Sequence, residues 1–87
     1  MKTETAQKKA EGISRSWYAR NQDLLANPFD AQNRKVMETQ KTLVRRYILR
    51  YKLSFQGEMT KVFDSVEREE IRQELNQGAP ETTMQMF

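Results

Sequence analysis

Residues 36–55 of this chain read VMETQKTLVRRYILRYKLSF, and apolar side chains recur there with the period of an α-helix. On a helical wheel of about 100° per residue, the apolar positions form a stripe roughly 140° wide. A stripe of this width is typical of a helix that packs on a globular core, because a coiled-coil seam is narrower. The stripe contains Phe29, Val36, Met37, Leu43, Val44, Tyr47, Ile48, Tyr51 and Phe55. We therefore predict a helix over residues 28–56, with Leu43, Tyr47 and Tyr51 buried.

The end of this segment also fits a β-strand. Apolar residues alternate there with polar ones, at Leu49, Tyr51, Leu53 and Phe55. The following Gln56-Gly57 resembles a two-residue hairpin loop. The alternative fold is therefore α+β, with a hairpin of strands 49–55 and 58–63 followed by a helix over residues 65–77. The continuous helix is preferred because it explains the whole length of the apolar stripe.

A first helix is predicted over residues 4–26. Its apolar face contains Ala6, Ala10, Ile13, Trp17 and Leu24. Asn27-Pro28 ends this helix, because the residue before a proline is pushed away from helical angles. Pro28 also suits the first position of the next helix, with Asn27 as its cap, Asp30 as a second candidate cap, and Phe29 in its first turn.

A third helix is predicted over residues 58–77, although its apolar face slips after Val66. Asp64 and Glu67 have the spacing of a capping box, and a helix that begins at Ser65 would explain the slip. Gly78 and Pro80 then end the helix. The expected fold is all-α: one helical domain of three helices over residues 1–78 and a flexible C-terminal tail over residues 79–87.

The composition argues against several classes of function. The chain has no histidine and no cysteine, which removes the commonest general base and the usual zinc ligands. The three glycines are isolated, so no glycine-rich phosphate loop is present. We therefore expect no enzymatic activity, no cofactor and no metal. No apolar run is long enough to cross a membrane or to act as a signal peptide, so we expect a cytoplasmic protein.

Charge is unevenly distributed along the chain, whose net charge is +3. Basic residues dominate the middle of the chain. Arg34, Lys41, Arg45 and Lys52 form a ridge beside the apolar stripe of the second predicted helix, and Arg46 and Arg50 flank the other side of the stripe. The candidate contacts to phosphates or to a partner are Arg34, Lys41, Arg45, Arg46, Arg50 and Lys52. Such a ridge could follow a nucleic-acid backbone, or it could be the solvated face of a soluble helix. No recognisable nucleic-acid-binding motif supports the first interpretation.

Two further features are candidates for partner binding. Trp17 and Tyr18 lie about 100° apart on the first helix, so one of them should remain exposed and could anchor an interface. The last third of the chain has an acidic run of Asp64, Glu67, Glu69, Glu70 and Glu74. These acids could form a solvated helix face, bind a basic partner, or pair with the basic middle helix of the same or another copy.

Together these observations predict a small, basic, helical accessory or regulatory protein that docks on a larger protein partner, one that itself handles nucleic acid. The alternatives are a direct nucleic-acid-binding protein that uses the basic ridge, and a structural subunit that self-assembles into a homo-oligomer. We expect no interaction with membranes.

Overall fold

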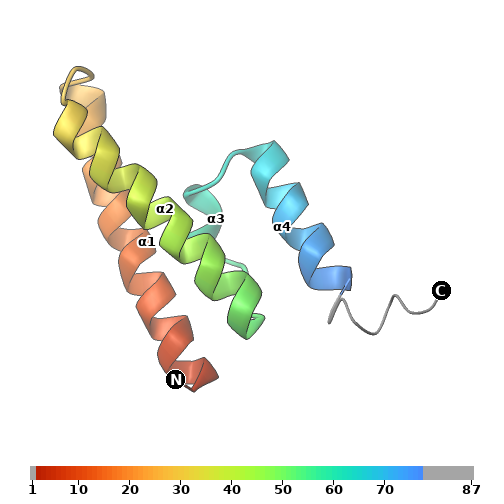
Figure 1. Ribbon diagram of the computed structural model, residues 1–87. Helices are drawn as coiled ribbons and strands as arrows, with labels where there is room; N and C mark the ends of the chain where they lie inside the picture. Colours follow the sequence, from red (N-terminus) through yellow and green to blue (C-terminus); the bar gives the residue numbers. More distant parts are fainter. Residues whose placement is uncertain (1, 78–87) are drawn as a thin grey trace.

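The computed structural model describes residues 2–77, which form four helices (Figure 1). α1 spans Thr3–Ala26, α2 spans Ala31–Tyr51, α3 spans Glu58–Lys61 and α4 spans Ser65–Gln77. α1 and α2 form an antiparallel hairpin, while α3 packs on α1 and α4 packs on α2. The predicted all-α class is confirmed, and residues 2–77 contain no strand. The tail predicted over residues 79–87 lies outside the described residues.

Small side chains make up the buried face of α1. Ala6, Ala10 and Ser14 are fully buried, and their spacing of four residues places them on one side of the helix. The Ser14 hydroxyl donates a hydrogen bond to the Ala10 carbonyl at 2.8 Å, so its burial leaves no unpaired donor. Because the distance between packed helices depends on the side chains at the contact, this face allows its neighbours to approach closely.

The larger core side chains come from α2 and from the segments that follow it. Val44 and Ile48 of α2 are fully buried and belong to the same cluster as Ala6 and Ala10. The other members of the cluster are Leu53, Met59, Val62, Phe63 and Ile71. The core therefore lies between the hairpin and the C-terminal segment, on one side of α1 and α2.

Leu43, Tyr47 and Tyr51 are only partly buried, which contradicts the prediction that they form the centre of the core. The two tyrosines pack on the edge of the core, with their ring centres 6.1 Å apart. Leu43 is not among the described side chains that pack against the cluster. The apolar stripe is centred on Val44, and Leu43 lies about 100° around the helix from it.

The second helix is shorter at both ends than the predicted range 28–56. At its C-terminal end Lys52 adopts a left-handed conformation with φ 51°, and the Leu53 N–H donates to the Ile48 carbonyl at 3.1 Å. This is the hydrogen bond of a Schellman motif, which reverses the chain after Tyr51. The reversal buries Leu53 in the core, which explains why Leu53 falls outside the helical stripe.

The alternative hairpin of strands 49–55 and 58–63 is wrong. The backbone of Ser54 pairs with the side chain of Gln7 in α1: the Ser54 N–H donates to Gln7 Oε1 at 3.0 Å, and Gln7 Nε2 donates to the Ser54 carbonyl at 3.2 Å. The amide thus occupies the backbone groups that a neighbouring strand would have paired. This contact also ties the loop after α2 to α1.

The third predicted helix, 58–77, is interrupted and forms α3 and α4. The predicted capping box is present, because the Asp64 N–H donates to Glu67 Oε1 at 3.0 Å and the Glu67 N–H donates to Asp64 Oδ1 at 2.8 Å. Arg68 donates to the carbonyls of Thr60 and Phe63, at 3.0 and 2.9 Å, around the end of α3. The slip in the apolar pattern after Val66 therefore reflects a new helix.

Replacing Ile48 with alanine should lower the free energy of unfolding by about 2–5 kcal/mol, because it leaves a cavity in the core. The matched change Leu43→Ala should cost clearly less, because Leu43 is partly exposed in wild type. Urea denaturation followed by circular dichroism measures both values. Equal losses for the two variants would contradict this assignment of the core.

Candidate functional site

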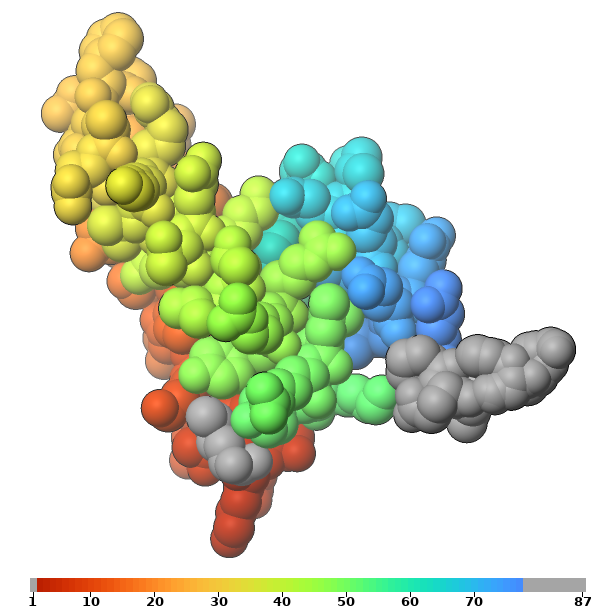
Figure 2. Space-filling view, in the orientation of Figure 1, coloured from red at the N-terminus to blue at the C-terminus, as the bar shows by residue number. Residues whose placement is uncertain are grey.

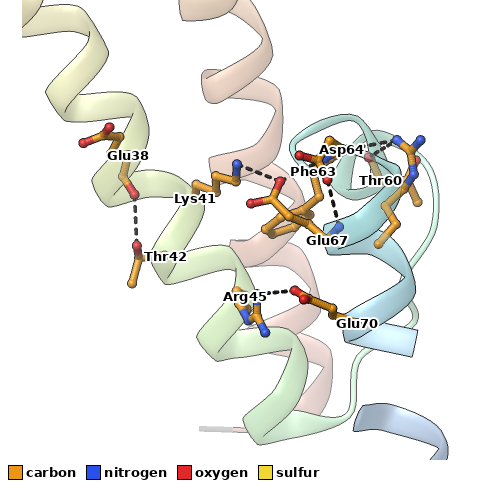
Figure 3. A network of polar contacts seen from close by, with 10 residues as sticks. Glu38, Lys41, Thr42, Arg45, Thr60, Phe63, Asp64, Glu67 and Glu70 are labelled. Carbon is orange, nitrogen blue, oxygen red and sulfur yellow. Dashed lines mark hydrogen bonds and ion pairs between the residues drawn. The ribbon is translucent and has the colours of Figure 1, made fainter. Parts of the chain in front are cut away.

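Part of the predicted basic ridge is covered by the acidic helix α4. Lys41 Nζ lies 2.8 Å from Glu67 Oε1. Figure 3 shows this ion pair between α2 and α4. Arg45 pairs with Glu74 at 3.0 Å and lies 3.9 Å from Glu70. Glu67 Oε1 also closes the capping box, so one carboxylate oxygen both caps α4 and holds it to α2. The acidic run therefore pairs with the basic middle helix of the same chain.

The residues of the predicted ridge have different surroundings, and Arg46 and Arg50 lie on another side of α2. Lys41 and Arg45 lie against α4. The guanidinium of Arg34 donates to the Pro28 carbonyl in the turn between α1 and α2. The exposed remainder, towards the end of α2, consists of Arg46, Arg50 and Lys52. Of these, Arg50 lies 5.7 Å from the ring centre of Tyr51, at cation–π distance.

The two candidate aromatic residues differ in their surroundings. Trp17 is half-buried and packs against the core, and its side chain also borders a small hollow of about 130 Å³ with Leu24 and Met37. Tyr18 is 39% exposed, and Lys61 Nζ lies 5.1 Å from the centre of its ring. The expectation that one of the pair remains exposed is therefore confirmed for Tyr18, although Lys61 partly covers it.

The last turn of α1 and the turn that follows it expose two large apolar side chains. Phe29 is 89% exposed and Leu25 is 69% exposed. We call residues 25–30 the hairpin tip, which projects from the rest of the molecule in Figure 2. The prediction that Phe29 belongs to a core stripe is wrong, because α2 begins at Ala31 and leaves Phe29 in the turn. Asp30, and not Asn27, caps α2 by accepting a hydrogen bond from the Asn33 N–H at 2.9 Å.

A partly buried polar pair holds the hairpin together behind its tip. Asn33 is buried, and its Nδ2 donates to the Arg20 carbonyl at 2.9 Å. The Arg20 guanidinium donates in return to Asn33 Oδ1 at 3.1 Å. The Asn27 N–H also donates to the Asp23 carbonyl at 3.0 Å. Hydrogen bonds therefore fix the turn on both sides, and Phe29 is presented by an ordered loop.

A second surface lies on the hairpin itself, where Lys9, Gly12, Ile13, Ser16, Gln40 and Tyr47 line a hollow of about 470 Å³. Gln40 Nε2 donates to Ser16 Oγ at 3.2 Å and so links the two helices there. Glycine inside a helix costs about 1 kcal/mol relative to alanine. A Cβ at Gly12 would meet, among the described residues, only Arg15 Nη2 at 3.9 Å. Packing within residues 2–77 therefore does not require glycine at this position.

Two kinds of feature are absent from the described residues. Within residues 2–77, no group of three His, Cys, Asp or Glu side chains is placed to hold a metal ion. In the same range, no helix has both the length and the apolar character needed to cross a bilayer. Comparison with known protein families, with curated proteins and with solved structures finds no match to this chain.

Sequence reasoning missed the contribution of Asn33 and the exposure of Leu25 and Phe29. A signal was present for the exposure of Phe29, because Asp30 is a strong helix cap. Starting α2 after Asp30 would have placed Phe29 outside the helix. The contact of Asn33 with Arg20 had no local signal, because it depends on how α1 and α2 pack.

The change Asn33→Ala should lower the free energy of unfolding by about 1–3 kcal/mol, because it removes both hydrogen bonds between Asn33 of α2 and Arg20 of α1, one of them to a charged guanidinium. The neighbouring exposed Gln32 provides a matched control, and Gln32→Ala should have little effect. Thermal and urea denaturation test both variants. If Asn33→Ala were as stable as wild type, the polar pair would not hold the hairpin.

The ion pair between Arg45 and Glu74 should contribute little to stability, because both side chains remain substantially exposed. A double-mutant cycle with alanine at both positions should give a coupling energy below about 1 kcal/mol, decreasing as salt is added. A coupling of several kcal/mol that does not change with salt would show that α4 is held mainly by charge.

Proposed function

We propose that this chain is a small non-enzymatic protein-interaction module that docks on a larger partner and modulates it, with the hairpin tip as its anchor. The exposure of Phe29 and Leu25 supports this proposal most directly. Single exposed apolar residues are common on protein surfaces. Here, however, two large ones lie only four residues apart at the projecting end of the hairpin, Leu25 in the last turn of α1 and Phe29 in the turn after it.

The energetics of the tip favour docking. Burial of a phenylalanine or leucine side chain in a partner stabilises a complex by about 1.5–3 kcal/mol. Ordering a loop on binding opposes this gain. The pair formed by Asn33 and Arg20, together with the Asp30 cap, already orders the turn in the free protein. The tip therefore needs little reorganisation when a partner covers it, as expected for an interface anchor.

Direct nucleic-acid binding has less support. Lys41 and Arg45 already face carboxylates of α4, and Arg34 contacts the turn. A phosphate backbone would have to displace α4 to reach all four residues of the predicted ridge, because Lys41 and Arg45 belong to it. Self-assembly through acidic and basic faces has less support for the same reason, because α4 places its acids against α2 of its own chain. These contacts favour a protein partner over nucleic acid. From the sequence, we propose that this partner is met in the cytoplasm and belongs to nucleic-acid-handling machinery.

The tip proposal is tested by affinity capture of partners from an extract of the native host. The change Phe29→Ser, alone or with Leu25→Ser, should reduce capture of the partner at least about tenfold, which corresponds to 1.4 kcal/mol. The control is Val66→Ser, because Val66 of α4 is 66% exposed but lies away from the tip. Unchanged capture by the folded tip variants would contradict the proposal.

The nucleic-acid alternative is tested by electrophoretic mobility shifts at several salt concentrations. We expect only non-specific binding, with Kd in the range of about 10⁻⁴–10⁻⁶ M, because the ridge is divided. A sub-micromolar complex at physiological salt, weakened by Arg46→Glu and Arg50→Glu, would support the nucleic-acid alternative against our proposal.

A further inference from the structure

The C-terminal half of the described chain covers only one side of the α1–α2 hairpin. α4 meets Lys41 and Arg45, and the loop after α2 meets Gln7. On α2, Leu43 and Tyr47 lie about 160° around the helix from the midpoint of Lys41 and Arg45. We call the side that bears Leu43 and Tyr47 the open face, because residues 2–77 leave it uncovered.

The open face combines an apolar floor with a basic rim. Ile13 of α1 and Val36, Leu43 and Tyr47 of α2 are all partly exposed there. The rim consists of Lys9, Arg46 and Arg50, which are exposed. None of the residues that line its hollow is acidic. The pattern is therefore complementary to an element with an apolar stripe flanked by carboxylates.

We infer that the open face binds an acidic amphipathic helix of a partner protein. The chain already contains one contact of this kind on the opposite side of α2. There α4 buries Ile71 and places Glu67 and Glu74 against Lys41 and Arg45. The open face has the same two features, apolar side chains and adjacent cations, but no helix of residues 2–77 packs on it.

Gly12 adds a second reason to choose a helix as the occupant. It borders the hollow, no packing among the described residues requires it, and the small Ser16 follows one turn later. Because small residues at this spacing project little from α1, a helix that lies along the hairpin can approach the α1 backbone closely. A third helix packed in this groove completes a layer of helices, which is a common mode of peptide recognition.

Two other occupants fit less well. A second copy docked through the same face would bring Lys9, Arg46 and Arg50 close to the same residues of its partner, and like charges repel. A nucleic acid would pair with the rim but leave the apolar floor without a complementary group. The inference rests on the proposed function only in taking the partner to be a protein, and it uses no residue of the tip.

The test uses the full chain, labelled with ¹⁵N, and a designed helical peptide with leucines along one face and glutamates on both flanks. Chemical-shift changes should concentrate at residues 9–16 of α1 and 39–50 of α2. Leu43→Ser and Gly12→Gln should each weaken binding about tenfold. Gly12→Gln should also melt at or above the wild-type temperature, because glutamine is a better helix former. The control Val66→Gln should bind as wild type does.

Several outcomes would overturn the inference. One is the absence of chemical-shift changes at about 1 mM peptide. Another is a set of shift changes confined to the tip or to the α4 side at Lys41 and Arg45. A third is that a peptide with lysines in place of the flanking glutamates binds as tightly as the acidic peptide. Tighter binding of a single-stranded DNA to the same face would assign that face to nucleic acid. If Phe29→Ser loses partner capture but the peptide does not bind, the tip proposal is supported and the open-face inference is not. If Phe29→Ser keeps partner capture and the peptide binds, the open-face inference is supported and the tip proposal is not.

Discussion

Close packing against the small buried face of α1 is the constraint on which the rest of the structure depends. Because Ala6, Ala10 and Ser14 project little from the helix, α2 and α3 can both pack close to α1. The polar contacts between distant residues, at Asn33 and at Gln7, form only when the helices are this close. A large side chain on this face would separate the helices and break both contacts.

This arrangement gives the molecule two parts with different roles. The hairpin is held together by the buried side chains between α1 and α2 and by the hydrogen bonds of Asn33 with Arg20. It bears both the tip and the open face. α4 is attached by Ile71, by Leu75 at the edge of the core and by ion pairs on the surface. Since exposed ion pairs contribute little, α4 should be the less stable part. Its position nevertheless decides which cations of α2 remain free.

Local patterns predicted much of the fold. The spacing of apolar residues found α1 nearly to its ends, and the capping box of Asp64 and Glu67 located the start of α4. The end of α2 could not be predicted from local patterns. Lys52 adopts a left-handed conformation that lysine does not favour, and burial of Leu53 in the core offsets the free-energy cost of this conformation. The candidate site was less predictable: pairing of Arg45 with Glu74, for example, depends on where α4 lies.

Both proposed surfaces require a hairpin that is already formed in the free protein. Native-state hydrogen exchange of the isolated chain tests this most directly, because it reports the free energy of opening at each amide. We predict that the slowest amides lie around Ala10–Ser14 of α1 and Val44–Ile48 of α2, and that those of α4 exchange faster. Rapid exchange throughout α1 and α2, with protection appearing only when a partner is added, would contradict the account.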